Sequence, residues 1–172
     1  KDVSLEIAAL FGCAIATGVG AVLNTARVEE GASVAIFGLG GVGLAAVMGA
    51  MLAGAYPIVA VDLLPAKVEL ARSIGATHGV VVGDGDAVEA IRDITGGGAD
   101  YAFETAGSVE AMSLAYKATR RGGVTVTVGL PHPERVLSLP AVSLTAEERI
   151  LKGSYMGSTN PRRDLPRFLT LH

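Results

Sequence analysis

The sequence predicts an α/β fold, a doubly wound parallel six-stranded sheet that forms a single domain. Apolar segments of strand length alternate with helical segments six times along the 172 residues, which is typical of a parallel sheet with helices on both faces. The segment 58–61 is apolar throughout, as strands buried on both faces are. A glycine-rich turn at 38–43 joins the first strand to a helix.

The elements are expected in a regular order. A helix rich in small residues covers 3–28, and strands follow at 33–37, 58–61, 80–82, 101–103, 124–128 and 150–155. Helices between them cover 42–53, 65–73, 87–95 and 109–119, and a last helix begins at residue 163. Pro65 favours a helix start, Gly75 a helix end, and Ser108 can cap the helix 109–119. Arg120 and Arg121 are expected to end that helix and to complement its C-terminus.

Composition excludes several classes of protein. Half of the residues are hydrophobic, which is enough for a sizeable core. A formal net charge of -3 gives no electrostatic case for binding nucleic acid or an anionic membrane. The single cysteine allows no internal disulfide, and no signal peptide is recognised, so we expect a cytoplasmic protein.

The segment 34–61 contains no charged residue and is long enough to span a bilayer. Its glycines and Pro57 divide it into strand, turn, helix and strand, which favours a soluble domain. The helix 42–53 is apolar on nearly every side, so we expect it to be covered on more than one side. This pattern is a first indication that something packs against the domain.

The glycine turn has the spacing of a dinucleotide-binding loop. Gly38 permits a tight turn, Gly40 lets backbone N–H groups approach a pyrophosphate, and Gly43 lets the helix pack closely. Leu39, Gly41 and Val42 complete the turn. The phosphates would lie at the helix N-terminus, where free N–H groups and the macrodipole favour anions.

Asp62 follows the strand 58–61 and lies 19 positions after Gly43. A carboxylate there can accept hydrogen bonds from both hydroxyls of an adenosine ribose, and it would repel a 2′-phosphate. Leu63 and Leu64 come next, with no arginine to receive a phosphate. The sequence therefore favours NAD over NADP, although Asp62 could also be a solvated loop residue.

Ligands of doubly wound sheets collect at the carboxyl ends of the strands. That rule predicts that Asp62, the segment Glu104, Thr105 and Ala106, and the segment Val128, Gly129 and Leu130 form one edge of the site. The last two segments could instead be ordinary loops between a strand and a helix.

A complete catalytic site is not evident. His78, in a turn before the third strand, His132 and His172 show no metal-like or nucleophile-like spacing. Glu104 could act as a general base, but a loop carboxylate is more often structural. Cys13 lies on an apolar segment, where cysteine is usually a buried small hydrophobe; it could also be one ligand of a catalytic zinc whose other ligands lie elsewhere.

Several segments together resemble the medium-chain zinc-dependent alcohol dehydrogenases. They are 12–20, 24–26, 34–43, 53–55 and 59–62, continued by Lys67, 75–77, 103–104 and 128–129. The resemblance covers almost the whole chain. It implies that Cys13 is the third ligand of the catalytic zinc and that Thr17 lies beside the nicotinamide, in a catalytic role. It also implies cofactor contacts by Gly38 to Gly43 (pyrophosphate), Asp62 and Lys67 (adenosine ribose), and Thr105, Ala106, Val128, Gly129 and Leu130 (nicotinamide half).

The family also has a catalytic domain with a further zinc-binding Cys and His, a four-cysteine structural zinc lobe and a proton relay, none of which this sequence contains. The chain thus resembles the coenzyme domain of a longer enzyme. We expect a helical lead-in at 1–28, a Rossmann domain at 29–160 and the start of a helix returning to the catalytic domain at 161–172. One thiolate cannot hold a catalytic zinc, so the chain alone is expected to be metal-free and inactive.

The resemblance implies hydride transfer between an alcohol or aldehyde and NAD in the full-length enzyme, with zinc polarising the alcohol oxygen. A zinc-free, quinone-type reductase of the same superfamily, a non-catalytic NAD(H)-sensing module and a methyltransferase are the alternatives. Cys13 and Asp62 argue against the quinone-type reductase, and the resemblance along almost the whole chain argues against the methyltransferase. The family is usually dimeric or tetrameric, and residues 135–139 near the sheet edge could pair with a second copy.

Overall fold

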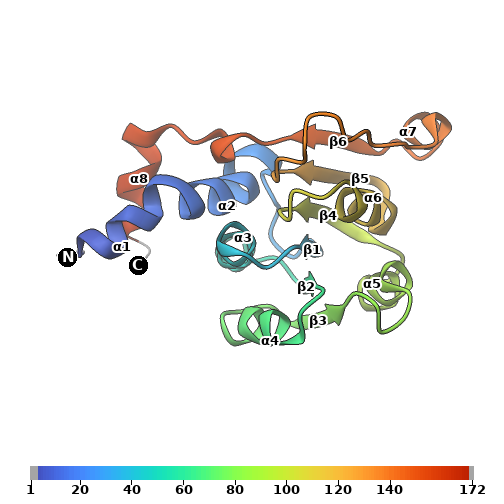
Figure 1. Ribbon diagram of the computed structural model, residues 1–172, viewed down its shortest axis with the longest axis horizontal. Coiled ribbons are helices and arrows are strands. Elements are labelled where there is room, and N and C mark those ends of the chain that lie inside the picture. The colour runs from blue at the N-terminus through green and yellow to red at the C-terminus, as the bar shows by residue number, and fades with distance from the viewer. Residues whose placement is uncertain (1–3, 171–172) are drawn as a thin grey trace.

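The computed structural model describes residues 4–170, and its centre is one parallel sheet of six strands (Figure 1). The strand order is β3-β2-β1-β4-β5-β6, and every neighbouring pair is parallel. The strands are β1 (Val34–Phe37), β2 (Ile58–Asp62), β3 (His78–Val81), β4 (Ala99–Glu104), β5 (Thr119–Thr127) and β6 (Ile150–Gly153). The predicted fold class is confirmed, and the strand order reverses at β1, which pairs with both β2 and β4.

Helices cover both faces of the sheet. The main ones are α3 (Gly41–Leu52), α4 (Pro65–Ser73), α5 (Ala87–Thr95) and α6 (Val109–Ala118), followed by α7 (Ala141–Ala146) and α8 (Pro161–Thr170). Before β1 the chain is one continuous helical stretch of α1 (Leu5–Leu10), η1 (Phe11–Ile15), α2 (Ala16–Gly20) and η2 (Ala21–Ala26), in which η1 and η2 are π-helical.

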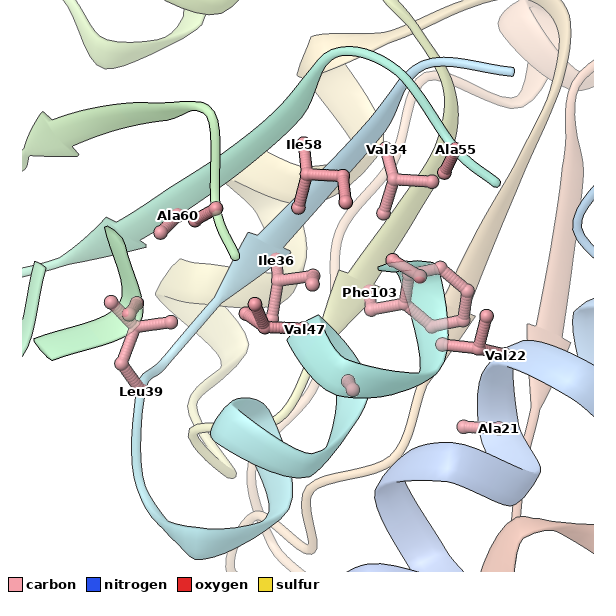
Figure 2. Close-up of a cluster of buried hydrophobic side chains, with 14 of the residues drawn as sticks. Ala21, Val22, Val34, Ile36, Leu39, Val47, Ala55, Ile58, Ala60 and Phe103 are labelled. Atoms are coloured by element: carbon pink, nitrogen blue, oxygen red, sulfur yellow. The ribbon is translucent and has the colours of Figure 1, made fainter. Parts of the chain in front are cut away.

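Successive side chains of β1 and β2 point to opposite faces of the sheet, so the core has two layers. Val34, Ile36 and Ile58 pack against Val47 of α3 on one face, and Figure 2 shows this cluster with Val22 of the N-terminal helix beside it. The residues between them, such as Phe37 and Val59, face α5 and α6 on the other side of the sheet. Because both faces are covered, these strands have no polar face, which explains their continuous apolar sequence.

The apolar helix α3 is covered by the chain itself. Figure 1 shows α3 between β1 and the N-terminal helix. The two helices approach so closely that a Cβ on Gly18 would lie 2.3 Å from the Val42 carbonyl oxygen, and one on Gly49 would lie 3.1 Å from the Cα of Val19. The small residues at 12–20 therefore permit a close helix crossing. We expected something outside the domain to cover the second side of α3, but that side is covered mainly by the N-terminal helix of this chain.

One helical stretch in the described part of the chain, Ala8–Ala26, has the length and hydropathy of a membrane span. Half of it is buried inside the molecule, where it packs against α3 and against the segment that follows β6. The uncharged segment 34–61 is divided into β1, α3 and β2, as predicted.

Two local expectations were wrong. Arg120 and Arg121 belong to β5, and the Arg120 Nε donates to Asp100 Oδ1 at 2.5 Å. His78 opens β3 rather than lying in the preceding turn. In both cases the position depends on a neighbouring strand that is distant in the sequence. Residues 135–139 form no strand, and β6 is the edge strand on that side; pairing of 135–139 with a second copy stays a prediction.

Candidate dinucleotide-binding site

A cavity of about 400 Å³ lies at the carboxyl ends of β1, β2 and β4. Its lining includes seven of the residues that sequence analysis proposed for the cofactor: Gly38, Leu39, Gly40, Asp62, Lys67, Thr105 and Ala106. The cavity lies at the point where the strand order reverses, which is where doubly wound sheets bind nucleotides.

Three of the four glycines of the turn, Gly38, Gly40 and Gly43, have different surroundings. Gly38 has a φ of 91°, and a Cβ there would lie 2.7 Å from the Cβ of Ala106. A Cβ on Gly43 would lie 1.9 Å from the Gly38 carbonyl oxygen, so no side chain fits between the turn and α3. A Cβ on Gly40 would meet nothing within 4 Å. Gly38 and Gly43 are therefore required by the packing of the protein, whereas the space beside Gly40 is open to a ligand.

The first turn of α3 begins at this open space. Gly40 is the N-cap residue, with extended backbone and no side-chain cap. The first hydrogen bond of the helix runs from the Leu44 N–H to the Gly40 oxygen at 2.9 Å, so the N–H groups of Gly41, Val42 and Gly43 have no partner within the helix. Free N–H groups, the positive end of the dipole and an open approach fit a pyrophosphate.

Asp62 ends β2 and connects it to the glycine turn. Its Oδ2 accepts from the Leu39 N–H at 2.7 Å, and its Oδ1 accepts from the Leu64 N–H at 3.0 Å. These bonds fix the carboxylate at the cavity wall. Each oxygen can accept a further bond, so the carboxylate retains capacity for the two hydroxyls of a ribose.

Thr105 and Glu104 hold the loop after β4. The Thr105 hydroxyl donates to the carbonyl oxygen of Gly38 at 2.6 Å, which ties this loop to the glycine turn. Glu104 is fully buried, and its Oε1 accepts from the Gly107 N–H at 2.6 Å while its Oε2 accepts from the Thr127 hydroxyl at 3.2 Å. These partners support the structural interpretation of Glu104 over that of a general base.

The loop after β5 extends the same edge beyond the cavity. The N–H groups of Val128 and Gly129 both approach the Glu104 carbonyl oxygen, at 2.8 and 3.2 Å. A Cβ on Gly129 would lie 2.1 Å from the Gly107 nitrogen, so the two loops are in direct contact. Leu130 is 78% exposed. The two predicted loop segments therefore lie together, although Val128, Gly129 and Leu130 are not in the cavity wall.

The N-terminal helix reaches the same region. Cys13 is exposed, which excludes the interpretation as a buried small hydrophobe in this chain. Ala14, the residue after Cys13, lies close to the start of α3, because a Cβ on Gly41 would be 3.5 Å from the Ala14 Cβ. Thr17 is buried, and its hydroxyl lies 3.8 Å from the sulfur of Met156. Residues 4–170 contain no group of three or more potential metal-binding side chains. A single thiol cannot form a zinc site, so these residues alone do not fit a catalytic zinc.

Several cavity residues were not predicted from the sequence. Leu63, Val82 and Leu114 add apolar surface to the cavity wall, which suits a purine ring. Leu63 and Val82 directly follow β2 and β3, so the rule of the carboxyl ends could have found them. Leu114 lies on α6, and only the packing of that helix brings it to the cavity.

The cavity is also lined by Glu110, which pairs with Arg135 of the loop after β5. Hydrogen bonds from the Ser108 hydroxyl and from backbone N–H, with Arg135 nearby, hold the pKa of Glu110 below its usual range. Ser108 also caps α6 as predicted, accepting from the Ala111 N–H at 3.3 Å. The exposed Glu110 carboxylate lies on the same wall as Asp62, and Arg135 offsets its charge.

The turn after β6 is strained. Three consecutive residues of η3 (Met156–Ser158) have positive φ, of 50°, 63° and 49°. A left-handed conformation costs a non-glycine residue about 1–2 kcal/mol, and such strain persists only where surrounding contacts enforce it. The turn packs against the N-terminal helix so closely that a Cβ on Gly157 would lie 2.3 Å from the Ala16 carbonyl oxygen.

The fold and the cavity together define a dinucleotide-binding domain of the Rossmann type. Comparison with known proteins shows which family within this class the chain resembles. A family model described as zinc-binding dehydrogenase matches residues 41–171. Alcohol dehydrogenase 2 of Zea mays is 41% identical over 174 residues, covering 99% of this chain and 46% of the relative. Alcohol dehydrogenase 1 of Solanum tuberosum is 43% identical over 165 residues, covering 94% and 43%.

Solved structures give the same result. An alcohol dehydrogenase zinc-binding domain protein from Burkholderia ambifaria matches with a TM-score of 0.97 at 40% identity, covering 100% of this chain and 46% of that one. Benzyl alcohol dehydrogenase from Acinetobacter calcoaceticus matches with a TM-score of 0.96 at 34% identity, covering 99% and 47%. The chain belongs to the zinc-binding dehydrogenase family. It spans about half the length of the relatives that it matches.

Proposed function

We propose that this chain binds NAD(H) as the coenzyme half of a zinc-dependent alcohol dehydrogenase that transfers hydride between an alcohol or aldehyde and the nicotinamide. The observation that supports the proposal most is the cavity at the point where the strand order reverses. There the uncapped N-terminus of α3 and the Asp62 carboxylate lie together. The names of the relatives support the substrate class. A cytoplasmic location is part of the same proposal.

The residues of this chain would bind and orient the cofactor. The N–H groups at the start of α3 would donate to the pyrophosphate, and Asp62 would accept from the adenosine ribose, with Lys67 nearby. The apolar wall formed by Leu63, Val82 and Leu114 would exclude water from one side of the adenine. When bound, NAD supplies the hydride acceptor, so the contribution of the protein is to place the two reactants in line.

Cys13 would supply one zinc ligand, and the others would come from a catalytic domain outside this chain. A zinc ion in such a site lowers the pKa of a bound alcohol. The exposure of Cys13 and the proximity of its neighbour Ala14 to the start of α3 support this role. Thr17, in the same helix, would lie beside the nicotinamide.

Titration of the chain with NADH, followed by its fluorescence, tests cofactor binding directly. The variant Asp62→Ala should bind NADH about 10- to 100-fold more weakly, because it loses charge-assisted hydrogen bonds to the ribose. NADPH should bind the unsubstituted chain more weakly than NADH, because Asp62 would repel its 2′-phosphate. The matched control Asp93→Ala, at an exposed position of α5, should bind NADH normally. Unchanged affinity in Asp62→Ala, or tighter binding of NADPH, would contradict the proposal.

A homodimer or homotetramer of the complete protein is also proposed. All four residues of the edge strand β6 are exposed, and its outer edge has no partner strand in the sheet. An unprotected edge can pair with a second copy. Sedimentation velocity of the complete protein at micromolar concentration should show an oligomer, and a monomer would contradict this part of the proposal.

A further inference from the structure

One buried hydroxyl connects the N-terminal helix to the segment that contains the strained turn η3. Thr25 lies in η2 and is 9% exposed. Its Oγ1 is 2.8 Å from the hydroxyl of Ser154, two residues before the turn, and 2.8 Å from the hydroxyl of Ser158, which is the last residue of the turn. A single side chain therefore links Ser154 to the end of η3 and joins both to the helix.

Neighbouring side chains contribute weaker support. The Asn24 amide donates to the Gly157 oxygen at 3.4 Å, and the Thr159 hydroxyl donates to the Ala16 oxygen at 3.0 Å. Neither contact involves the side chains of the turn itself. Because non-glycine residues disfavour positive φ, the turn needs such contacts to keep its conformation, and Thr25 holds it most directly.

The position of η3 connects it to the second half of the cofactor site. A dinucleotide bound to a doubly wound sheet crosses the point where the strand order reverses, with one nucleotide on each half of the sheet. Asp62 belongs to the β1–β3 half, so the second nucleotide lies toward the carboxyl ends of β4, β5 and β6. Two residues separate the end of β6 from the turn, and Met156 lies against Thr17.

We propose that Thr25 is a positioning residue for the nicotinamide half of the cofactor. Its hydroxyl holds η3 in the left-handed conformation and thereby holds Met156 against Thr17, while Thr25 itself stays buried away from the ligand. This inference rests on the proposed function, because it assumes that NAD(H) binds at the cavity with its nicotinamide half toward η3. It assigns a role in binding to a residue that lies outside the cavity.

Calorimetric titration of the 172-residue chain with two ligands tests this role. NADH has a nicotinamide and ADP-ribose lacks one, whereas both carry the adenosine and the pyrophosphate. In Thr25→Val, the dissociation constant for NADH should rise about fivefold relative to that for ADP-ribose, which is the effect expected for one misplaced hydrogen-bonded turn. Thr25→Ser keeps the hydroxyl and should restore the ratio.

Thr125→Val is the matched control. Thr125 is also buried, and its hydroxyl pairs with that of Thr119 at 2.8 Å within β5. The control therefore loses a comparable buried hydroxyl pair and should leave the ratio of the two affinities unchanged. Ser158→Ala removes one partner of Thr25 at an exposed position, so it provides a test that does not depend on a buried substitution, and it should change the ratio in the same direction.

The outcomes separate this inference from the proposed function. If the unsubstituted chain binds neither ligand, the proposed function fails and this inference fails with it. If the chain binds both ligands, but Thr25→Val and Ser158→Ala leave the ratio unchanged, only the role of Thr25 is overturned. A change of the ratio in Thr125→Val of the same size would also overturn it, because any lost buried hydroxyl pair would then have the same effect.

Discussion

Gly40 and Gly43 lie three positions apart in one turn, and they are glycines for opposite reasons. Gly43 has no room for a side chain, because the Gly38 carbonyl oxygen occupies the space that a Cβ would need. Gly40 has room for one, and its backbone conformation, with φ of -78°, is open to any residue. The packing of the protein therefore explains Gly43 but not Gly40, whereas the proposed phosphate site at the start of α3 would explain Gly40.

This difference predicts a separation of stability from binding. Gly43→Ala should lower the free energy of unfolding by about 1–3 kcal/mol, because the turn must move to admit a methyl group. Gly40→Ala should change that free energy by less than about 1 kcal/mol and still weaken NADH binding about tenfold, because its methyl group occupies the phosphate approach. Urea unfolding and NADH titration measure the two effects.

Gly12→Ala is the control for this pair, because a Cβ at Gly12 also meets nothing within 4 Å and lies outside the cavity. It should leave both unfolding and NADH binding close to those of the unsubstituted chain. If Gly40→Ala binds NADH as tightly as Gly12→Ala does, the phosphate is not at the start of α3.

Among the helices and strands, hydrogen bonds between neighbouring strands determine where β4 and β5 begin. The Asp100 Oδ2 accepts from the N–H and the hydroxyl of Ser33, at 2.8 and 2.6 Å, and its Oδ1 accepts from Arg120. Thr119 takes an extended conformation, while its hydroxyl donates to the Ala115 oxygen at 2.8 Å. These contacts join the start of β1, β4 and β5, and they place Arg120 in a strand rather than at a helix end.

The hydrogen bonds of Ser33 and Arg120 to Asp100 predict that stability depends on pH. Burial alone would raise the pKa of Asp100, but hydrogen bonds from Ser33 and Arg120 outweigh burial and lower it. A carboxyl whose pKa is lower in the folded state stabilises the protein above its unfolded pKa of about 3.9 and loses that contribution as the pH falls through the folded value. The free energy of unfolding should therefore fall on acidification below about pH 4, and Asp100→Asn should reduce this fall.

Urea unfolding at several pH values measures this slope. The control Asp93→Asn changes an exposed carboxyl and should keep the slope of the unsubstituted chain. The same slope in Asp100→Asn as in the control would show that the Ser33–Asp100–Arg120 contacts do not stabilise the ionised form.

At the scale of the whole molecule, the described residues contain the parts of a cofactor site but not of a metal site. Glycine turn, carboxylate and cavity lie together, whereas residues 4–170 hold no group of three or more side chains that could bind a metal, at Cys13 or elsewhere. The chain covers 46% of the length of Zea mays alcohol dehydrogenase 2. Catalysis is therefore proposed for an assembly that brings further ligands to Cys13.

In the complete protein, Cys13→Ser should reduce both the zinc content and the rate of alcohol oxidation, because an alcohol oxygen is a much weaker zinc ligand than a thiolate. NADH affinity should stay within about twofold, which serves as the control for correct folding. Metal analysis of the purified variant measures the first effect. Full retention of zinc and activity would mean that Cys13 is not a ligand, and a zinc-free reductase or an NAD(H)-sensing module would then gain support.

The alternation of the six strands with the main helices, the parallel sheet, the glycine turn with Asp62 and the cap at Ser108 could all be predicted from the sequence. Each of these depends on residues close together in the chain, so periodicity and spacing are sufficient to find them. Helix bounds such as Pro65–Ser73 agree with the structure for the same reason.

The contacts between distant segments became visible only in the folded structure. It placed the small residues of the N-terminal helix against α3, paired Arg120 with Asp100, brought Leu114 to the cavity and held η3 in a left-handed turn beneath Thr25. No local pattern encodes these contacts, because each one joins residues that the chain separates and that come together only when helices and strands pack. The glycine turn is encoded by residues close together in the chain, whereas the contacts that hold η3 join residues more than 100 positions apart.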